Sequence, residues 1–206
     1  MKSIKLLFLA IFIFSSFSEI AEGQILFAAK GGANLTKGAF EQETTNYALK
    51  YHFGFFSQIS FSNKVGLRVE LLYSKKGWRI PNDALNNNIS ITLSYLNLPV
   101  LVDYEVSKRL TLFAGSELGY KLSEARNPKG SVPDYEKIDL GLTLGTSYVI
   151  NSKIGVDLRY VLGFKGLINE NVLYTDIYGN TTTRKLKDGS NRTIMLGIFY
   201  LFNNPK

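Results

Sequence analysis

The stretch that decides the fold runs from residue 154 to residue 165 and reads IGVDLRYVLGFK. Every even position carries a large apolar side chain, and the odd positions carry Gly, Asp, Arg, Val, Gly and Lys. Because successive side chains of a strand point to opposite faces, one face is bulky and apolar while the other is small and charged. A soluble barrel would turn its apolar face inward. Here glycines and charges suit a narrow interior and the apolar face needs lipid outside, which is typical of a transmembrane β-barrel.

The first 23 residues read as a secretory signal peptide. Lys2 and Lys5 form a short basic region, residues 6–14 are an unbroken apolar run, and small residues precede the predicted cut. The apolar run is far shorter than the roughly 20 residues of a transmembrane helix. We therefore expect a signal peptide over residues 1–23 and one exported barrel domain over residues 24–206.

The composition excludes several classes of function. The chain has no cysteine, so a lipoprotein anchor, disulfides and thiolate metal sites are excluded. Its formal net charge is +7, from 24 Lys and Arg against 17 Asp and Glu. Because an exported protein rarely meets nucleic acid, we expect this excess charge to be solvated or to face anionic lipopolysaccharide. No phosphate-cradling loop is present, and no cofactor is predicted.

The alternation recurs in eight segments. This pattern predicts an all-β fold, an eight-stranded antiparallel up-and-down transmembrane β-barrel. A tilted spanning strand needs roughly 9–11 residues, and each segment can supply them. The predicted strands are Ile25–Leu35, about Tyr51–Ser60, Val65–Ser74, Ile89–Glu105, Leu110–Lys121, Ile138–Ile150, Ile154–Lys165 and Thr193–Phe202.

The fourth predicted strand changes its register. Its apolar residues fall on odd positions over residues 89–95 and on even positions over residues 96–104. A bulge near Tyr95 and Leu96 would reconcile the two halves by keeping both apolar runs on one face. Pro99 cannot donate a ladder hydrogen bond, which also indicates an irregularity there.

The predicted connections alternate between short and long without exception. Outer-membrane barrels have short periplasmic turns and longer extracellular loops. An even strand count puts both chain ends at the periplasmic side, and an open sheet edge cannot stand in lipid, so the first strand must pair with the last. We expect a monomer. The tight turns are residues 61–64, 107–109 and 151–153, and the long connections are about 36–50, 75–88, 122–136 and 166–190.

Aromatic residues close the outward rows at both ends, as two interfacial girdles would require. Tyr51, Tyr73, Tyr120 and Phe164 lie toward the loops, and Phe61, Tyr104, Tyr148 and Phe202 lie toward the turns.

The last long connection reads as a hairpin. Residues 174–178 and 181–186 flank Gly179-Asn180, which is a two-residue turn signal. We expect this hairpin to project beyond the membrane, either as a binding surface or as a protective extension without a dedicated partner.

Charged residues of both signs fall on the inward face of most strands. The interior of an eight-stranded barrel is just wide enough to be filled by side chains. Unpaired buried charge is costly, so we expect these groups to pair across the lumen in a structural network. Arg68 with Glu70, and Asp157 with Arg159, lie two apart, so each strand brings its own counterion. The inward charges are Lys30, Arg68, Glu70, Asp103, Glu117, Lys121, Asp139, Asp157 and Arg159.

Three stretches resemble the PorT-like outer-membrane β-barrel family of Bacteroidota. Residues 95–101, YLNLPVL, resemble its Tyr-Leu-x-Ile/Leu-Pro fourth strand, and residues 113–120, FAGSELGY, resemble its Gly-x-x-x-Gly-Tyr fifth strand. The opening residues 30–35, KGGANL, are similar to its first strand. The resemblance extends over about residues 24–202. It implies an eight-stranded outer-membrane barrel and little about activity, although the named member takes part in the secretion of other proteins.

The C-terminal strand resembles a barrel-assembly signal. Gly197, Tyr200 and Phe202 have the spacing of such signals, which implies recognition by the barrel-assembly machinery. The chain departs from the pattern because four residues follow Phe202, where the final aromatic usually ends the chain.

We expect an integral protein of the cell outer membrane, without enzymatic activity, that has a structural or surface-binding role through its long loops. The alternatives are narrow-pore transport of small solutes, an accessory role in secretion, an outer-membrane lipid-modifying enzyme and a soluble lipocalin-like carrier. The enzyme hypothesis rests on His52, the single histidine, which has no recognisable nucleophile motif. No catalytic, cofactor-binding or metal-binding residue is predicted, and the sequence does not identify the ligand of the loops.

Overall fold

The chain is described by a computed structural model. The described residues are 25–40, 44–81, 89–127, 135–164, 166–175 and 181–203. The predicted signal peptide and the Gly179-Asn180 turn lie outside them. Within the described part of the chain, no helix is long and apolar enough to cross a membrane.

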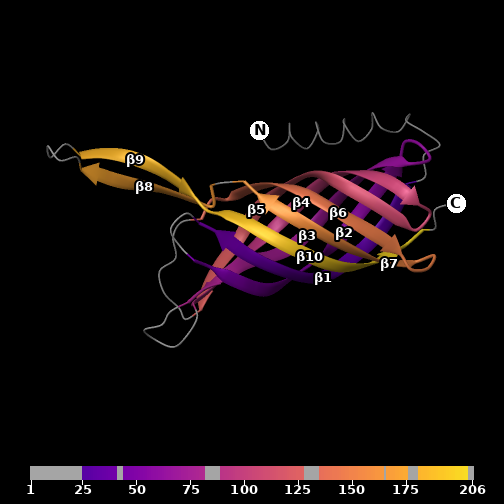
Figure 1. Cartoon of the computed structure of the whole chain (residues 1–206), viewed down its shortest axis with the longest axis horizontal. Coiled ribbons are helices and arrows are strands. Elements are labelled where there is room, and N and C mark those ends of the chain that lie inside the picture. Colours follow the sequence, from indigo (N-terminus) through magenta and orange to yellow (C-terminus); the bar gives the residue numbers. More distant parts are fainter. Residues whose placement is uncertain are drawn as a thin grey trace, which may run out of the picture.

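Ten strands make up the described structure (Figure 1). Eight of them close into an antiparallel barrel in the order β1-β10-β7-β6-β5-β4-β3-β2, which confirms the predicted fold class, and β8 pairs with β9 in a separate sheet. The strands are β1 (Ile25–Ala39), β2 (Asn46–Ser60), β3 (Val65–Ile80), β4 (Ile89–Ser107), β5 (Leu110–Asn127), β6 (Ile138–Val149), β7 (Ile154–Gly163), β8 (Ile168–Thr175), β9 (Thr181–Asp188) and β10 (Ser190–Leu201).

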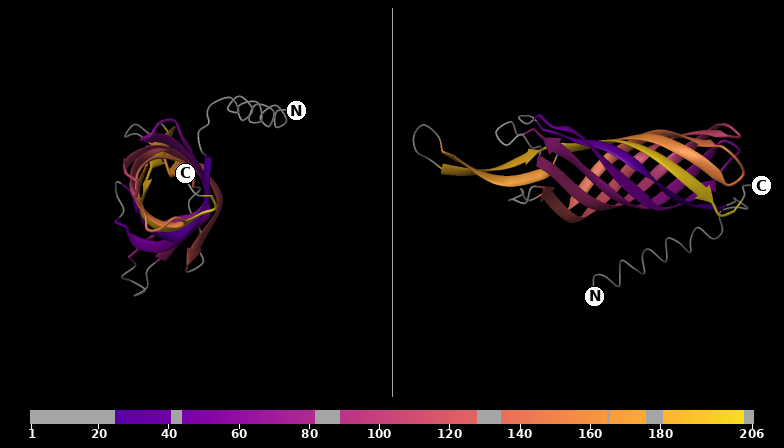
Figure 2. Two further views of the ribbon diagram at one scale, coloured as in Figure 1. Left: turned by 90° about the vertical axis from the view of Figure 1, so that its right-hand side faces the viewer. Right: turned by 90° about the horizontal axis from the view of Figure 1, so that it is seen from below.

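The first and last barrel strands close the wall. β1 and β10 pair from Ala28 opposite Leu201 to Ala39 opposite Ser190. Figure 2 shows the closed ring along its axis and the tilted strands from the side. This closure satisfies the backbone of both strands within the chain, which lipid requires because it offers no hydrogen-bond partners.

The strands reach further at the loop end than the sequence predicts. β2 begins at Asn46, β3 continues to Ile80 and β5 continues to Asn127. Part of each of the first three expected long connections is therefore barrel wall, whereas the fourth forms the separate β8–β9 sheet. The opposite end keeps its tight turns, such as residues 61–64, where the Ser62 hydroxyl accepts hydrogen bonds from two following backbone amides.

The predicted hairpin forms, and it projects from the loop end of the barrel (Figures 1 and 2). β8 and β9 pair from Ile168 opposite Asp188 to Thr175 opposite Thr181, so the hairpin begins earlier than predicted. Gly189 joins β9 to β10 with a φ of 79°, a left-handed conformation that favours glycine.

The outward face of the barrel is apolar along most of its length. Leu144, Leu196 and Ile198 are each more than half exposed and stand on two different strands. The predicted girdle residues also face outward, with Tyr73 half-buried and the other seven exposed. Soluble monomers rarely expose contiguous apolar surface of this kind, and it fits a lipid belt.

The wall reverses its polarity where β4 passes Tyr95. Below this point Leu96, Leu98 and later even-numbered residues face outward. Above it Leu93 and Ile91 are buried inside, and the outward positions are Ser and Thr. The expectation that a bulge keeps both apolar runs on one face is therefore wrong, because β4 alternates without a break and its upper part has polar outward side chains over an apolar interior.

The register irregularity is real but belongs to β5. Ser94 pairs with Ser123, whereas Tyr95 pairs with Lys121, so Leu122 is the extra residue. Its insertion exchanges the inward and outward positions of β5, as a β-bulge does.

A charge on the lipid belt should destabilise the protein. Leu158 lies at the middle of β7 and is 49% exposed. We expect Leu158→Arg to lower the free energy of unfolding in lipid vesicles by about 2–4 kcal/mol, measured by urea titration. Ala125→Arg, on the outer wall above the polarity reversal, should cost about 0–1 kcal/mol. Equal losses in both variants would show that the belt is wrongly placed.

The polarity reversal also predicts where water meets the wall. We expect Ser123→Cys on intact cells to react with a maleimide coupled to a polymer too large to cross the outer membrane. Leu118→Cys, on the outward face of β5 within the apolar belt, should stay unlabelled, and the natural chain offers no competing thiol. Labelling of Leu118→Cys, or protection of Ser123→Cys, would contradict the assignment.

Candidate functional site

The lumen contains a network of buried charged side chains, and Arg159 lies at the centre of this network. Its guanidinium donates two parallel hydrogen bonds of 2.9 Å to the Glu70 carboxylate across the lumen. It also donates to Asp157 Oδ2, two residues away on β7, from Nη2 at 2.5 Å and from Nε at 3.0 Å. Bidentate pairs of this kind are the strongest and most directional charged contacts in proteins.

Two further cations complete this network. The Lys30 ammonium donates to Asp157 Oδ2 at 2.6 Å and lies 3.5 Å from Glu70 Oε2. Arg68 donates from Nε to Asp103 Oδ2 at 3.1 Å. The expectation that each strand brings its own counterion fits both strands. Arg159 pairs with Asp157 on β7, and Arg68 Nη1 lies 4.0 Å from Glu70 Oε1 on β3, although the shorter contact of Arg68 is to Asp103 on β4.

The central network is electrically balanced. It contains three cations and three carboxylates, and the side chains are at most 3% exposed. The guanidinium carbons of Arg68 and Arg159 both lie over the Phe113 ring, at 4.8 and 4.9 Å. Burial of charge is tolerated only when each ion is paired, and every ion of this network has a partner of opposite charge, although Asp103 Oδ1 and Asp157 Oδ1 accept no hydrogen bond from a described residue.

An apolar layer separates this network from a second one. Leu72, Val161 and Met195 point inward from three strands and are at most 1% exposed. Val161 is the one large apolar residue among the odd-numbered, inward positions of residues 154–165.

The second network is centred on Lys76. Its ammonium lies 3.0 Å from both Glu117 Oε1 and Asp139 Oδ2. The side-chain amide of Asn97 donates to the same Glu117 oxygen, and that of Asn191 donates to Asp139 Oδ2 at 2.8 Å. The network thus joins β3, β4, β5, β6 and β10 across the lumen.

Sequence reasoning missed Lys76 because its segment was assigned to a loop. The signal was present, since Lys76 continues the even-numbered inward row of Arg68, Glu70 and Ser74. Lys121, which was predicted to join the lumen charges, instead pairs with Glu124 at 2.5 Å and donates to the backbone of the segment after β5.

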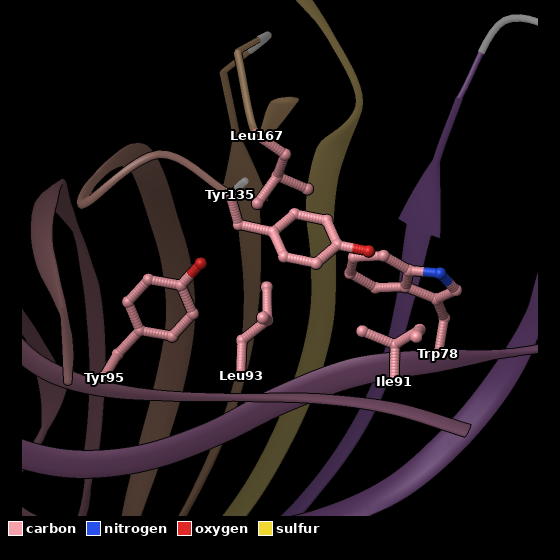
Figure 3. Close-up of a cluster of buried hydrophobic side chains, with 6 residues drawn as sticks. All are labelled: Trp78, Ile91, Leu93, Tyr95, Tyr135 and Leu167. Atoms are coloured by element: carbon pink, nitrogen blue, oxygen red, sulfur yellow. The ribbon is translucent and has the colours of Figure 1, made fainter. Parts of the chain in front are cut away.

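An apolar cluster fills the barrel above the second network (Figure 3). The Tyr135 ring stands edge-on to the Trp78 indole with centroids 5.6 Å apart, and Leu167 packs above Tyr135. Ile91, Leu93 and Tyr95 complete the floor of this cluster from β4. All six side chains are at most 3% exposed. The cluster combines side chains of β3 and β4 with residues that follow β5 and β7, and it fills part of the loop end of the barrel.

The turn end is more open. A cavity of about 440 Å³ enters the barrel there, between Lys108 and Arg109 at the turn and Arg68 at its floor. Its walls include Phe56 and Phe199, whose rings meet edge-on at 5.7 Å. A second cavity of about 260 Å³ lies at the loop end, and Asp139 of the second network is among the residues that line it.

His52 lies within the wall rather than at an exposed site. Its Nδ1 is 2.7 Å from Asn34 Oδ1, and the Asn34 amide in turn donates to Ser74 Oγ at 3.0 Å. The residue is 2% exposed. Among the described residues, no three His, Cys, Asp or Glu side chains gather as they would around a metal ion.

The residues of the assembly motif have two different positions. Gly197 faces the lumen, where an added Cβ would lie 2.3 Å from Asp157 Oδ1 and 3.2 Å from His52 Nε2. Tyr200 and Phe202 face outward with their rings 5.9 Å apart. Gly197 thus makes room for the central network, which is a structural requirement separate from any recognition of the motif.

Removing one partner of the central network should be costly. Glu70→Leu leaves Arg159 buried without its bidentate partner, and we expect the free energy of unfolding to fall by about 3–5 kcal/mol. Glu70→Leu with Arg159→Leu removes one charge of each sign, so the double variant should recover much of that loss. Urea titration in vesicles measures both. A double variant no more stable than Glu70→Leu would show that charge balance is not the controlling factor.

The chain was compared with known proteins by sequence and by structure. Comparison with curated proteins finds no match. The structure resembles the crystal structure of Neisserial surface protein A, with a TM-score of 0.54, 14% identity and coverage of 84% of this chain and 96% of that one. It also resembles the outer membrane protein OprG from Pseudomonas aeruginosa, with a TM-score of 0.53, 13% identity and coverage of 88% and 97%. Both likenesses show the eight-stranded fold.

The family model for the outer membrane protein beta-barrel domain matches residues 16–169, which is most of the chain. With its closed eight-stranded wall and apolar outer belt, this chain belongs to that family of outer-membrane β-barrel proteins.

Proposed function

We propose that this protein is a non-enzymatic, non-conducting outer-membrane scaffold whose function lies on its loop side. In this proposal the barrel is an anchor, and the extended wall and the β8–β9 hairpin present a surface for binding outside the cell. The observation that carries the proposal is the filling of the lumen by two charge networks, an apolar layer and an apolar cluster.

A filled lumen argues against a permanent pore. Any solute would have to displace the Leu72, Val161 and Met195 layer and then the cluster around Trp78 and Tyr135. It would also have to break hydrogen-bonded ion pairs whose partners would remain buried without counterions, which is costly. These contacts favour a rigid plug made by the wall itself.

The part of the barrel beyond the lipid belt supports a role in binding. Above the polarity reversal the wall is built like a soluble protein, with an apolar core and polar outward residues on β4. β8 and β9 extend further still, as a sheet that is not part of the barrel. Neither feature is needed to span a membrane, so we assign both to function.

An enzymatic role has weak support. A lipid-modifying hydrolase would need a nucleophile, a base and an accessible site. His52 is the single candidate base, and it is buried among Asn34 and Ser74. Narrow-pore transport is the second candidate, because the cavity of about 440 Å³ leads from the turn end to the polar lumen.

The remaining predictions belong to the same proposal. We propose export through a signal peptide over residues 1–23, assembly through Gly197, Tyr200 and Phe202, a monomeric state, and contact with lipopolysaccharide. The motifs at residues 95–101 and 113–120 support a place in the PorT-like branch. An accessory role in secretion is carried by that resemblance alone.

Conductance in planar bilayers tests the proposal. We expect the purified protein to give no stable current steps, because the apolar layer and the loop-end cluster block ions. A variant in which Trp78 and Tyr135 become Ala and Leu72, Val161 and Met195 become Gly should show steps, which proves that insertion is detectable. Steps of uniform size from the natural protein would support narrow-pore transport and end the scaffold proposal.

A further inference from the structure

A group of basic side chains lies on the outer wall just above the lipid belt. We call it the cationic patch, and it consists of Lys37, Lys75, Arg79 and Arg192. Lys37 on β1 stands directly opposite Arg192 on β10, and both occupy outward positions of their strands. Lys75 and Arg79 hold outward positions on β3, one strand beyond β2.

The cationic patch has no counterion in the described part of the chain. None of its four residues forms an ion pair with a described Asp or Glu. Like charges directly opposite one another on neighbouring strands are destabilising. The Lys37 and Arg192 pair therefore presents a site that an anion would stabilise.

Aromatic rings place the cationic patch at the level of lipid headgroups. The Lys37 ammonium lies 5.1 Å from the centre of the Tyr47 ring, and the Lys75 ammonium lies 5.1 Å from that of Tyr51. Tyrosines that face outward in this way occupy the membrane interface. Lys37 and Lys75 thus stand where a lipid carries its phosphates, and Arg192 lies directly opposite Lys37.

A strip of small residues lies on β1 within the lipid belt, separated from the cationic patch by the exposed side chain of Leu35. We call it the β1 strip, and it consists of Ala29, Gly31 and Ala33 on the outward face of β1. An added Cβ at Gly31 would meet no atom closer than 3.5 Å, so the wall there is open to the outside. Large exposed side chains flank the strip on both neighbouring strands: Phe53 and Phe55 on β2, and Leu196 and Ile198 on β10.

We propose that the cationic patch and the β1 strip bind one phosphorylated glycolipid of the outer leaflet. One phosphate lies between Lys37 and Arg192, a second is held by Lys75 and Arg79, and an acyl chain lies along the β1 strip. Paired cations at an interface suit phosphate oxygens, and Arg adds a planar fork of donors. The choice of the outer leaflet rests on the proposed function, which places the loop end outside the cell.

The turn end provides an internal control. Lys64, Lys108, Arg109 and Lys153 also form a basic rim, but they lie in three separate turns around the barrel. Lys64 and Lys153 can therefore be neutralised with the same loss of charge as Lys37 and Arg192. A lipid attracted only by net positive charge would respond equally to both changes.

The test is native mass spectrometry of the full protein in detergent micelles with lipid A that carries two phosphates. We expect Lys37→Gln with Arg192→Gln to weaken lipid A binding at least tenfold. Lys64→Gln with Lys153→Gln should stay within twofold of the natural protein, and dephosphorylated lipid A should bind the natural protein at least tenfold more weakly. Gly31→Leu, which fills the β1 strip, should weaken binding several-fold.

The opposite results overturn the proposal. Unchanged binding by the patch variant, an equal loss in both double variants, or equal binding of dephosphorylated lipid A or phosphatidylglycerol would each do so. Displacement of lipid A by an equal concentration of inorganic phosphate would show a free-anion site instead. Heat-modifiable gel mobility verifies that each variant is folded, and Lys37→Gln alone replaces a double variant that is not. Since micelles test neither conductance nor orientation, failure here leaves the scaffold proposal standing.

Discussion

Hydrocarbon offers no hydrogen-bond partners, and the whole structure depends on this constraint. The backbone of β1 must pair with that of β10, because a free edge in lipid would leave a row of unsatisfied groups. Once the ring is closed, the alternation of side chains along each strand decides whether a residue points into the lumen or outward. Even positions of β1, β2 and β3 enter the lumen, and odd positions meet lipid or water.

A small closed ring leaves little choice about how its interior is filled. Eight strands leave space for side chains and not for bulk water, so charged groups inside must satisfy one another. Arg159, Glu70 and Asp157 do so across the lumen, and Gly197 gives them room by having no side chain. The ion pairs that compensate the buried charges also fill the lumen. The same contacts therefore stabilise the barrel and occupy the space through which a solute would pass.

The sequence was sufficient to predict the parts of the barrel wall whose outer face meets lipid. The eight wall strands, the turns and the inward row of β7 all follow from period-two alternation with lipid outside. The prediction was wrong at Ile91 and Leu93, whose apolar side chains point inward because water surrounds the wall there. Alternation gives two faces without saying which solvent each one meets. Lys76 and Asn191 were missed for a related reason, since their strands continue where lipid no longer marks the pattern.

The β8–β9 hairpin has a consequence for how this protein can change over time. Its two strands satisfy each other, while β7 and β10 remain hydrogen-bonded neighbours beneath it. Beyond Ile168, which packs against the apolar cluster and pairs with Tyr135, β8 and β9 are therefore an insertion that is not part of the closed ring. Mutations can accumulate there, or a foreign sequence can replace it, at little cost to folding. Natural selection can therefore act on this segment almost independently of the barrel wall.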